Sequence, residues 1–289
     1  PPEGQPPSPE FAEWIERCTR RLWHPNHPGA TQARAWLTER GYEEQTLRDA
    51  RVGYDPGADR DTHWPRERRQ THGIPTIAGV TFPLYDRAGT LTYAQTRNLR
   101  WTPESRWPKY VNPTRIVTNP AIAYWADPGQ HAGRPVLIVE GPTDALAARQ
   151  THHDVAALIG AGHATNPAVV DQLVEAFGLD RPFIIMTDPD PAGRNAAQQL
   201  LAHLRQTGAP AVRHEPDGGD LAAWTQHHND PQAEIDTAIV GALRALSTTN
   251  RRALTPPSDA SLAERSFQAR GRSPLSVRTR LTSNALDRI

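Results

Sequence analysis

Two short stretches of the chain are continuously apolar. Residues 136–139 read Val-Leu-Ile-Val, and residues 183–186 read Phe-Ile-Ile-Met. An unbroken apolar run of this length is typical of a strand that is buried on both faces, as in a parallel sheet covered by helices. A strand at residues 155–159 and a helix at residues 167–177 are predicted between the two runs. The pattern therefore predicts an α/β domain with a parallel sheet.

Acidic residues follow each apolar run. Glu140 and Asp144 come after the first run, and Asp188 and Asp190 come after the second. The carboxyl ends of parallel strands meet at one edge of a sheet, so we expect these side chains to share one crevice. Four carboxylates there would repel unless cations neutralised them, and oxygen ligands suit two or more Mg²⁺ or Mn²⁺ ions. Taken alone, the sequence Asp-Pro-Asp-Pro also fits a turn with a helix N-cap.

The first part of the chain has a different pattern, which predicts a smaller mixed α+β lobe and makes the chain α+β overall. Two alternating segments joined through Asp-Arg-Ala-Gly predict an antiparallel hairpin at residues 80–84 and 91–96. Residues 55–73 are polar and charged without a clear period, which predicts a loop or an irregular helix. Apolar residues at helical spacing predict three helices, at residues 11–22, 31–40 and 43–50.

The acidic motifs resemble those of the Toprim domain, which bacterial primases share with type IA and type II topoisomerases and some nucleases. The family motifs are Glu-Gly-x-x-Asp and Asp-x-Asp-x-x-Gly. The resemblance implies catalytic roles for Glu140, Asp188 and Asp190, metal binding by these three and Asp144, and structural roles for the two glycines. Gly141 is expected to allow a sharp turn after Glu140. All six motif positions are intact: Glu140, Gly141, Asp144, Asp188, Asp190 and Gly193.

The preceding lobe resembles that of the DnaG-type primase catalytic core of bacteria and phages. That core carries, in order, a Phe-Pro strand, a turn with glycine, a strand with arginine, and Pro-Lys-Tyr-(Leu/Ile)-Asn. The counterparts here are Phe82-Pro83-Leu84, Gly89, Arg97 and Pro108-Lys109-Tyr110-Val111-Asn112. The resemblance covers about residues 10–230. It implies that nucleotide or DNA phosphates are bound by Arg97, Lys109, Asn112 and Arg194.

The chain departs from the family after a strand predicted at residues 211–214. Family members have a Pro-x-Gly-x-Asp segment there, with another carboxylate two residues beyond the last aspartate. Asp220 matches that aspartate, so the resemblance implies a further metal ligand. Leu221 and Ala222 follow it, however, so the additional carboxylate of the family is missing here. Whether Asp217 replaces that carboxylate stays open.

Composition excludes several classes of protein for this chain. The single cysteine, Cys18, excludes a disulfide framework and a cysteine-based zinc ribbon in this chain. No apolar run approaches the roughly 20 residues that span a bilayer, so a cytoplasmic protein without membrane contact is expected. The histidine pair at residues 152 and 153 is expected at the surface. Three segments are predicted, a lobe at 1–134, a Toprim domain at 135–230 and a helix with a tail at 231–289.

Charge is unevenly distributed along a chain whose net charge is zero. From Thr248 onward, eight arginines stand against three acidic residues, which gives 8 − 3 = +5 and leaves −5 for the preceding residues. This tail is predicted to be disordered. It serves either as a solvated linker or as a DNA-binding element.

Together these features predict a DNA primase core, which makes RNA primers from ribonucleoside triphosphates on a single-stranded DNA template. The alternatives are a metal-dependent Toprim nuclease and a Toprim protein that binds nucleic acid without catalysis. Lys109 is the only lysine and follows a proline, so the chain has no P-loop and is not an ATPase. A replicative helicase or a separate zinc-containing template-recognition module is an expected partner, since the resemblance does not extend to a zinc domain.

Overall fold

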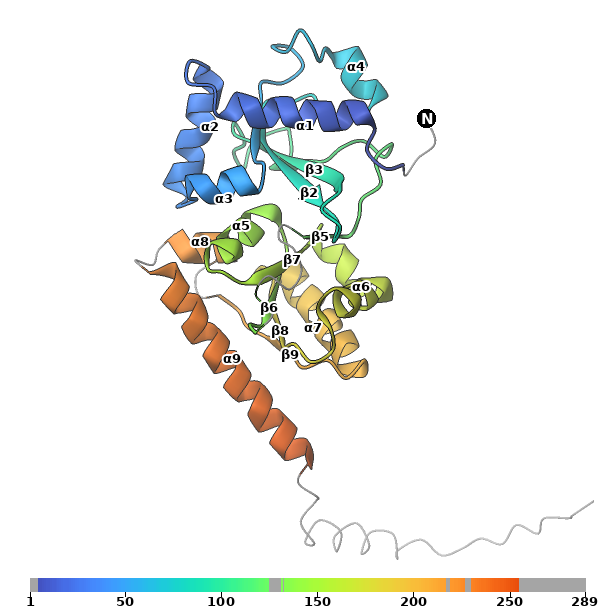
Figure 1. Cartoon of the computed structure of the whole chain (residues 1–289), viewed down its shortest axis with the longest axis vertical. Helices are drawn as coiled ribbons and strands as arrows, with labels where there is room; N and C mark the ends of the chain where they lie inside the picture. The colour runs from blue at the N-terminus through green and yellow to red at the C-terminus, as the bar shows by residue number, and fades with distance from the viewer. Residues whose placement is uncertain (1–4, 125–130, 132, 217–218, 227–229, 255–289) are drawn as a thin grey trace, which may run out of the picture. The chain divides into compact units, whose positions relative to one another are not determined.

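The computed structural model describes residues 5–124, 131, 133–216, 219–226 and 230–254 (Figure 1). The chain divides into two compact units, Pro1–Leu246 and Ser247–Ile289. Of the second unit, only the end of helix α9 (Pro231–Leu254) is described. The features below belong to the first unit. The predicted tail beyond residue 254 and Asp217 lie outside the described residues.

The predicted helices at the start of the chain are confirmed. The apolar stripe of α1, from Phe11 to Leu22, is buried, and the Ser8 hydroxyl caps its start by accepting from the Phe11 N–H at 3.2 Å. Gly41 follows the second helix with a φ of +74°, which suits glycine beyond a helix end. The bounds are α1 (Pro9–Leu22), α2 (Pro28–Glu39) and α3 (Glu44–Asp49).

Residues 55–73, predicted as a loop or irregular helix, contain the short helix α4 (Arg66–Thr71). The segment is ordered by a buried ion pair. The Arg69 guanidinium donates to both carboxylate oxygens of Asp55, at 2.5 and 2.8 Å, and to the carbonyls of Trp64 and Pro75, both at 2.7 Å. Its polar groups are thus satisfied although the side chain is fully buried. The spacing of apolar residues could not predict this helix, because an ion pair between charged residues orders the segment.

The strands of the described residues form one sheet of nine. The order is β4-β3-β2-β5-β7-β6-β8-β9, with β1 also paired to β2. Strand β6 is parallel to β7 and β8, and β8 is parallel to β9, which confirms the predicted parallel sheet. The other pairs are antiparallel. The bounds are β1 (Gly53–Asp55), β2 (Gly79–Tyr85), β3 (Leu91–Asn98), β4 (Tyr110–Val111), β5 (Ile122–Tyr124), β6 (Val136–Val139), β7 (Asp154–Leu158), β8 (Phe183–Met186) and β9 (Ala211–Arg213).

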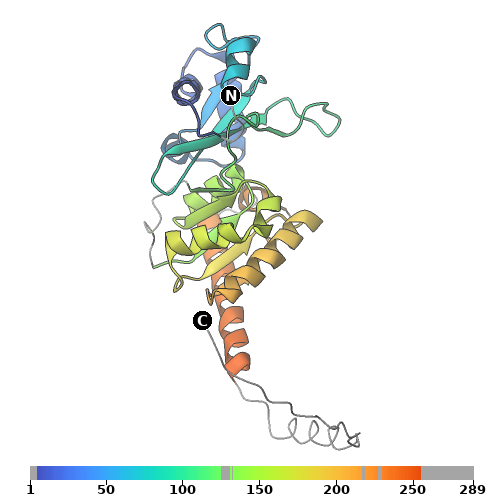
Figure 2. The same ribbon diagram turned by 90° about the vertical axis from the view of Figure 1, so that its right-hand side faces the viewer.

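Helices cover both faces of the parallel strands, which explains why their sequences are continuously apolar (Figures 1 and 2). Val136 and Ile138 pack into a core with residues of α6 and α7, whereas Leu137 and Val139 pack into another core with residues of α5, α8 and α9. None of the helices in the described ranges is long and apolar enough to cross a membrane. The bounds are α5 (Pro142–Gln150), α6 (Pro167–Phe177), α7 (Pro191–Gln206), α8 (Leu221–Gln226) and the 3-10 helix η1 (Ala161–Thr165).

Strand β5, which the sequence pattern did not indicate, makes the sheet continuous between its antiparallel and parallel parts. It pairs with β2 through Tyr124 and Tyr85, and with β7 along its whole length. One sheet therefore contains strands from both sides of residue 134, the predicted boundary between the first two segments. Strand β5 has only three residues, and its position in the sheet depends on its pairing with β2 and β7.

The prediction that His153 lies at the surface is wrong. The side chain is 2 % exposed, its Nδ1 lies 3.1 Å from the Thr151 hydroxyl, and its Nε2 lies 3.5 Å from a carboxylate oxygen of Asp236 on α9. Burial lowers the pKa of His153 to about 4, which favours the neutral ring. Its neighbour His152 is exposed, as predicted.

Candidate active site

The five predicted metal-binding acids all stand on segments that leave the parallel strands or begin the next helices. Val139 at the end of β6 pairs with Met186 at the end of β8, so Glu140 and Asp188 leave the sheet at the same edge. Asp190 is the N-cap of α7 and Asp144 lies in the first turn of α5. Asp220 directly precedes α8. We call Glu140, Asp144, Asp188, Asp190 and Asp220 the acid edge.

The acids of this edge lie close enough to perturb one another. Burial, followed by the charges of Asp188 and Asp190, raises the pKa of Glu140 to about 7. Burial, followed by Asp220 and Asp190, raises the pKa of Asp188 to about 6. Burial and the Asp220 charge hold the pKa of Asp144 well above its usual range. A bound cation would reverse each of these penalties.

Glu140 has the clearest capacity for a cation. Its Oε2 atom is buried without a hydrogen-bond partner in the described part of the chain. Within the same ranges, no three acidic, histidine or cysteine side chains already form a metal-binding cluster. Mg²⁺ is usually held by one or two carboxylates, with waters and substrate phosphates completing its shell. The acid edge fits that mode of binding better than an all-protein cage.

Three acids of the edge also stabilise the local fold. An Asp144 oxygen accepts from the Ala222 N–H of α8 at 3.0 Å, and an Asp220 oxygen accepts from the Ala223 N–H at 2.7 Å. An Asp190 oxygen caps α7 by accepting from the Gly193 N–H at 2.7 Å. The helix-cap interpretation of Asp-Pro-Asp-Pro is therefore confirmed for Asp190. Each of these groups keeps a second oxygen for another role.

Of the two motif glycines, only Gly193 occupies a position where a larger residue would not fit. A Cβ on Gly193 would come within 2.3 Å of the Asp188 carbonyl oxygen, so only glycine fits there. Gly141 has extended backbone angles, φ −135° and ψ 174°, which any residue adopts, and a Cβ would meet an Asp144 oxygen at an ordinary 3.5 Å. The chain does bend at Glu140 and Gly141, as expected, but this bend does not require glycine, because any residue can adopt the backbone angles of Gly141.

Gly193→Ala should destabilise the fold at the acid edge. The new methyl group would push against backbone atoms of Asp188, and overpacking of this kind typically costs about 1–3 kcal/mol of the free energy of unfolding. Urea unfolding measures the change. Gly241→Ala is the matched control, because Gly241 lies in α9 with no atom near its missing Cβ, and alanine there should raise stability by up to about 1 kcal/mol. Equal stability of the Gly193 variant and the parent would contradict the proposed close approach.

Of the predicted phosphate-binding residues, Lys109 lies close enough to the acid edge to affect Asp188. Its side chain is exposed, and its charge lowers the pKa of Asp188 against the larger effect of burial. Its ammonium nitrogen lies 5.9 Å from the centre of the Tyr110 ring. A mobile positive charge beside carboxylates is well placed to meet the phosphates of a nucleotide held by cations.

Arg97, another predicted phosphate-binding residue, lies among aromatic side chains. It is 7 % exposed, and its guanidinium carbon lies within 5.4–5.7 Å of the ring centres of Trp36, Trp101 and Tyr110. One Nη donates to the Lys109 carbonyl oxygen at 3.2 Å. Little of its surface is open to a phosphate, so its contact with the Lys109 backbone indicates a positioning role.

Asn112 and Arg194 are exposed but already have side-chain partners. Asn112 accepts from the Gln95 amide at 2.9 Å. Arg194 donates to a Glu215 oxygen from Nε at 3.2 Å and from Nη2 at 2.5 Å, and this ion pair raises the pKa of Arg194. Phosphate binding by either residue would require these contacts to open.

Two tyrosines missed by the sequence prediction connect the first lobe to the Glu-Gly-Pro-Thr-Asp motif. The Tyr42 hydroxyl donates to the Thr143 carbonyl oxygen, and the Tyr110 hydroxyl bonds to the Thr143 hydroxyl, both at 3.2 Å. Burial raises the pKa of Tyr110 to about 12. Strand β4, which carries Tyr110, is thereby tied to the helix that carries Asp144. In the sequence, only the position of Tyr110 next to Lys109 indicated that either tyrosine lies near the site.

Stability of the metal-free protein should depend on the ionisation of Glu140. The pKa of about 7 lies above the unfolded value, so the native state binds more protons than the unfolded chain from about pH 4 to about pH 7. Ionisation of Glu140 therefore destabilises the native state as the pH rises through this range. We therefore compare the melting temperatures of Glu140→Gln and the parent protein in EDTA. We expect the melting temperature of the variant to rise relative to that of the parent as the pH increases from 4 to 8. A difference that stays constant over this range would contradict the assigned repulsion.

Comparison with known proteins places this geometry in a family context. Residues 135–216 match the family model of the Toprim domain. No curated protein matches the chain. Among solved structures, the E. coli primase catalytic core has a TM-score of 0.59 at 21 % identity, covering 89 % of this chain and 88 % of that one. The DnaG primase catalytic domain bound to ssDNA has a TM-score of 0.58 at 20 % identity, covering 84 % of both chains.

A third match is the RNA polymerase domain of Mycobacterium tuberculosis primase DnaG in complex with double-stranded DNA. Its TM-score is 0.59 at 19 % identity, covering 79 % of this chain and 78 % of that one. The chain therefore contains a Toprim domain within the fold of a DnaG primase catalytic core. The predicted fold class and resemblance are confirmed, including the lobe that precedes the Toprim domain.

Proposed function

We propose that this chain is a DNA primase core that joins ribonucleotides on a single-stranded DNA template. The acid edge carries this proposal, because its partly buried carboxylates repel one another, and the charge of Lys109 acts on Asp188, within a DnaG-type fold. One solved structure of similar fold is described as bound to ssDNA, and another as an RNA polymerase domain of primase. Both descriptions support a nucleotidyltransferase.

In the proposed reaction, a strand's 3′-hydroxyl attacks the α-phosphate of a nucleoside triphosphate, and pyrophosphate leaves. Two divalent cations, when bound, would stabilise the attacking and leaving oxygens. Asp188 and Asp190 are proposed as principal ligands, with Asp144 and Asp220 in support. Glu140, whose pKa is about 7, is suited to accept the hydroxyl proton near neutral pH or to act as a further ligand.

Lys109 would hold the phosphates of the incoming nucleotide. Its ammonium is compact and carried on a flexible stem, so it can follow a phosphate whose position changes as the bond to the α-phosphorus breaks. Arg97 would act through Lys109 by fixing the carbonyl of that residue. Asn112 and Arg194 remain candidates for template contacts outside the reacting centre.

The first test is template-directed synthesis, run beside a nuclease assay. Purified protein is incubated with labelled ribonucleotides, Mg²⁺ or Mn²⁺ and a panel of single-stranded templates, and products are resolved by length. Short RNA complementary to the template supports the primase proposal. Cleavage of labelled DNA without synthesis would support a Toprim nuclease, and binding without either reaction would support a non-catalytic protein.

Two partners would complete the proposed role. Template recognition would come from a zinc-containing module, and delivery to the replication fork would come from a replicative helicase. Both are expected in the cytoplasm, where replication of bacterial or phage DNA takes place. Adding such a module to the synthesis assay would raise initiation on preferred templates.

A further inference from the structure

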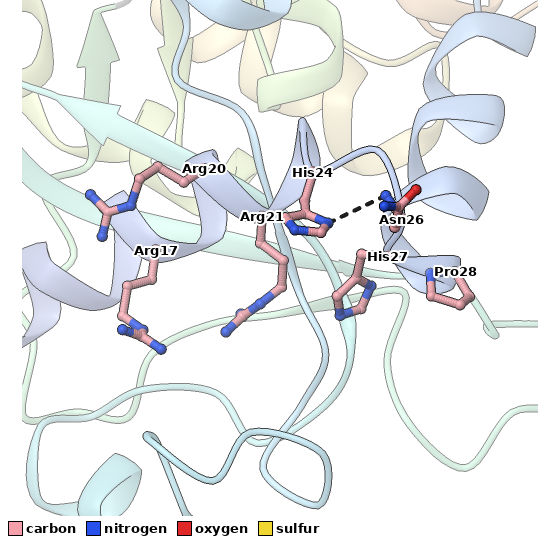
Figure 3. A pocket seen from close by; sticks show the side chains of 7 residues that line it. All are labelled: Arg17, Arg20, Arg21, His24, Asn26, His27 and Pro28. Atoms are coloured by element: carbon pink, nitrogen blue, oxygen red, sulfur yellow. Dashed lines mark hydrogen bonds between the residues drawn. The ribbon is translucent and has the colours of Figure 1, made fainter.

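A hollow lined by basic side chains lies at the end of α1 and in the loop that leads to α2 (Figure 3). Its volume is about 350 Å³. We call it the basic pocket, and no carboxylate is among its lining residues in the described part of the chain. It shares no residue with the acid edge. The charged and titratable side chains that line it are Arg17, Arg20, Arg21, His24 and His27.

The arginines of the pocket are only partly neutralised. Arg21 donates to Asp61 at 3.0 Å, but Asp61 also lies 3.6 Å from the Arg69 guanidinium and shares its charge. Arg20 pairs with Glu16 at 3.6 Å, and both side chains are largely exposed, so solvent screens the pair. Arg17 makes no ion pair with any residue in the described ranges. The pocket therefore keeps an excess of positive charge.

Two of its buried donors have no acceptor within the described residues. They are Nε of Arg17 and Nη1 of Arg21. Figure 3 shows both side chains extending to the same side of α1, with the His27 ring across the gap from Arg21. A buried N–H group without an acceptor is unfavourable, and nearly all such groups in native proteins are paired. Both atoms belong to guanidinium groups that line the pocket, so the pocket presents donors to a ligand that offers oxygen atoms.

The histidines add further donors. Nδ1 of His24 accepts from the Asn26 N–H, and Nδ1 of His27 accepts from the Ala30 N–H, both at 3.3 Å. These contacts assign the proton of each neutral ring to Nε2. Burial and the Arg21 charge lower the pKa of His27, which favours that neutral form. Every side chain that could bond a ligand strongly in this pocket is therefore an N–H donor or can act as one.

We propose that the basic pocket binds a phosphate group. Guanidinium groups bind phosphate through paired, charge-assisted hydrogen bonds, and a phosphate offers several acceptor oxygens to donors that approach from different sides. The backbone of a nucleic-acid strand and a free polyphosphate share this chemistry. The proposal does not depend on the proposed primase activity, because binding here requires neither divalent metal nor the acid edge.

Arg17→Gln combined with Arg20→Gln tests the proposal without disturbing the Arg21–Asp61 pair. Binding of a labelled single-stranded oligonucleotide is measured by fluorescence anisotropy in EDTA over a range of salt concentrations. If the pocket binds the backbone of a strand, we expect at least a tenfold loss of affinity. The slope of log affinity against log salt should fall by about 0.7 for each phosphate that the variant no longer neutralises. Arg87→Gln combined with Arg244→Gln removes the same charge outside the pocket and should change binding little.

Inorganic pyrophosphate separates the two sources of phosphate. Its titration is followed through the histidine ring signals in NMR spectra of the parent and of the Arg17/Arg20 variant. A selective loss of oligonucleotide binding identifies a strand. Ring shifts with pyrophosphate in the parent alone, with oligonucleotide binding unchanged, identify a free polyphosphate. If the variant matches the parent with both probes, the proposal is overturned.

Discussion

Asp188→Asn is expected to abolish metal-dependent primer synthesis while leaving the fold intact. The side chain keeps its shape but loses the negative charge that a divalent cation requires. Loss of transition-state stabilisation of several kcal/mol corresponds to a rate reduction of about a thousandfold or more. Primer synthesis under Mg²⁺ and under Mn²⁺, measured with labelled ribonucleotides, quantifies the effect.

Thermal unfolding in EDTA separates this loss from misfolding. Burial and the neighbouring carboxylates disfavour the ionised form of Asp188, so the neutral amide should keep or raise the melting temperature at pH 7. Asp190→Asn serves the same purpose at the second aspartate, since asparagine retains the N-cap of α7. Asp171→Asn, on an exposed position of α6, is the matched control. Parental synthesis by Asp188→Asn would remove this residue from the site.

Replacing Lys109 should give the second largest loss. We expect Lys109→Ala to reduce primer synthesis by about 100-fold, comparable to removal of one preorganised donor to a developing charge. Lys109→Arg should be impaired as well, because the planar guanidinium imposes a fixed geometry on the phosphate. Of 32 basic residues in the chain this is the single lysine, in a sequence that otherwise uses arginine.

The uniqueness of Lys109 also allows a direct binding measurement. Reductive methylation with ¹³C-formaldehyde labels this side chain and the terminal amine, so an NMR spectrum contains one lysine signal. A nucleoside triphosphate with Mg²⁺ should shift that signal, and Asp188→Asn should weaken the shift. Parental activity of both Lys109→Arg and Lys109→Ala, together with an unshifted signal, would exclude Lys109 from the site.

The sequence predicted those parts of the fold that rest on apolar pattern and on backbone chemistry. Strands β6 and β8 were predicted because both faces are buried, and α1 because its apolar stripe is continuous. Helix α4 could not be predicted this way, since the Arg69–Asp55 ion pair, and not an apolar face, holds its segment. Strand β5 is too short for a pattern and depends on its neighbours.

The candidate site was predicted as far as its residues follow strands directly. Glu140 and Asp188 meet at one edge because β6 and β8 are parallel and in register. Contacts between residues far apart in the chain were beyond prediction, such as those of Tyr42 and Tyr110 with Thr143. Arg97 was assigned to phosphate by its place in a motif, while its burial among aromatic rings depends on three separate segments.

The central claim is that the acid edge binds divalent cations, and Mn²⁺ titration followed by electron paramagnetic resonance tests it most directly. Free Mn²⁺ gives a signal that bound Mn²⁺ loses, so the assay counts bound ions without requiring activity. We predict that the parent and Asp171→Asn bind Mn²⁺ equally, and that Asp188→Asn and Glu140→Gln bind it at least tenfold more weakly. Equal binding by all four proteins would contradict the assignment of the acid edge.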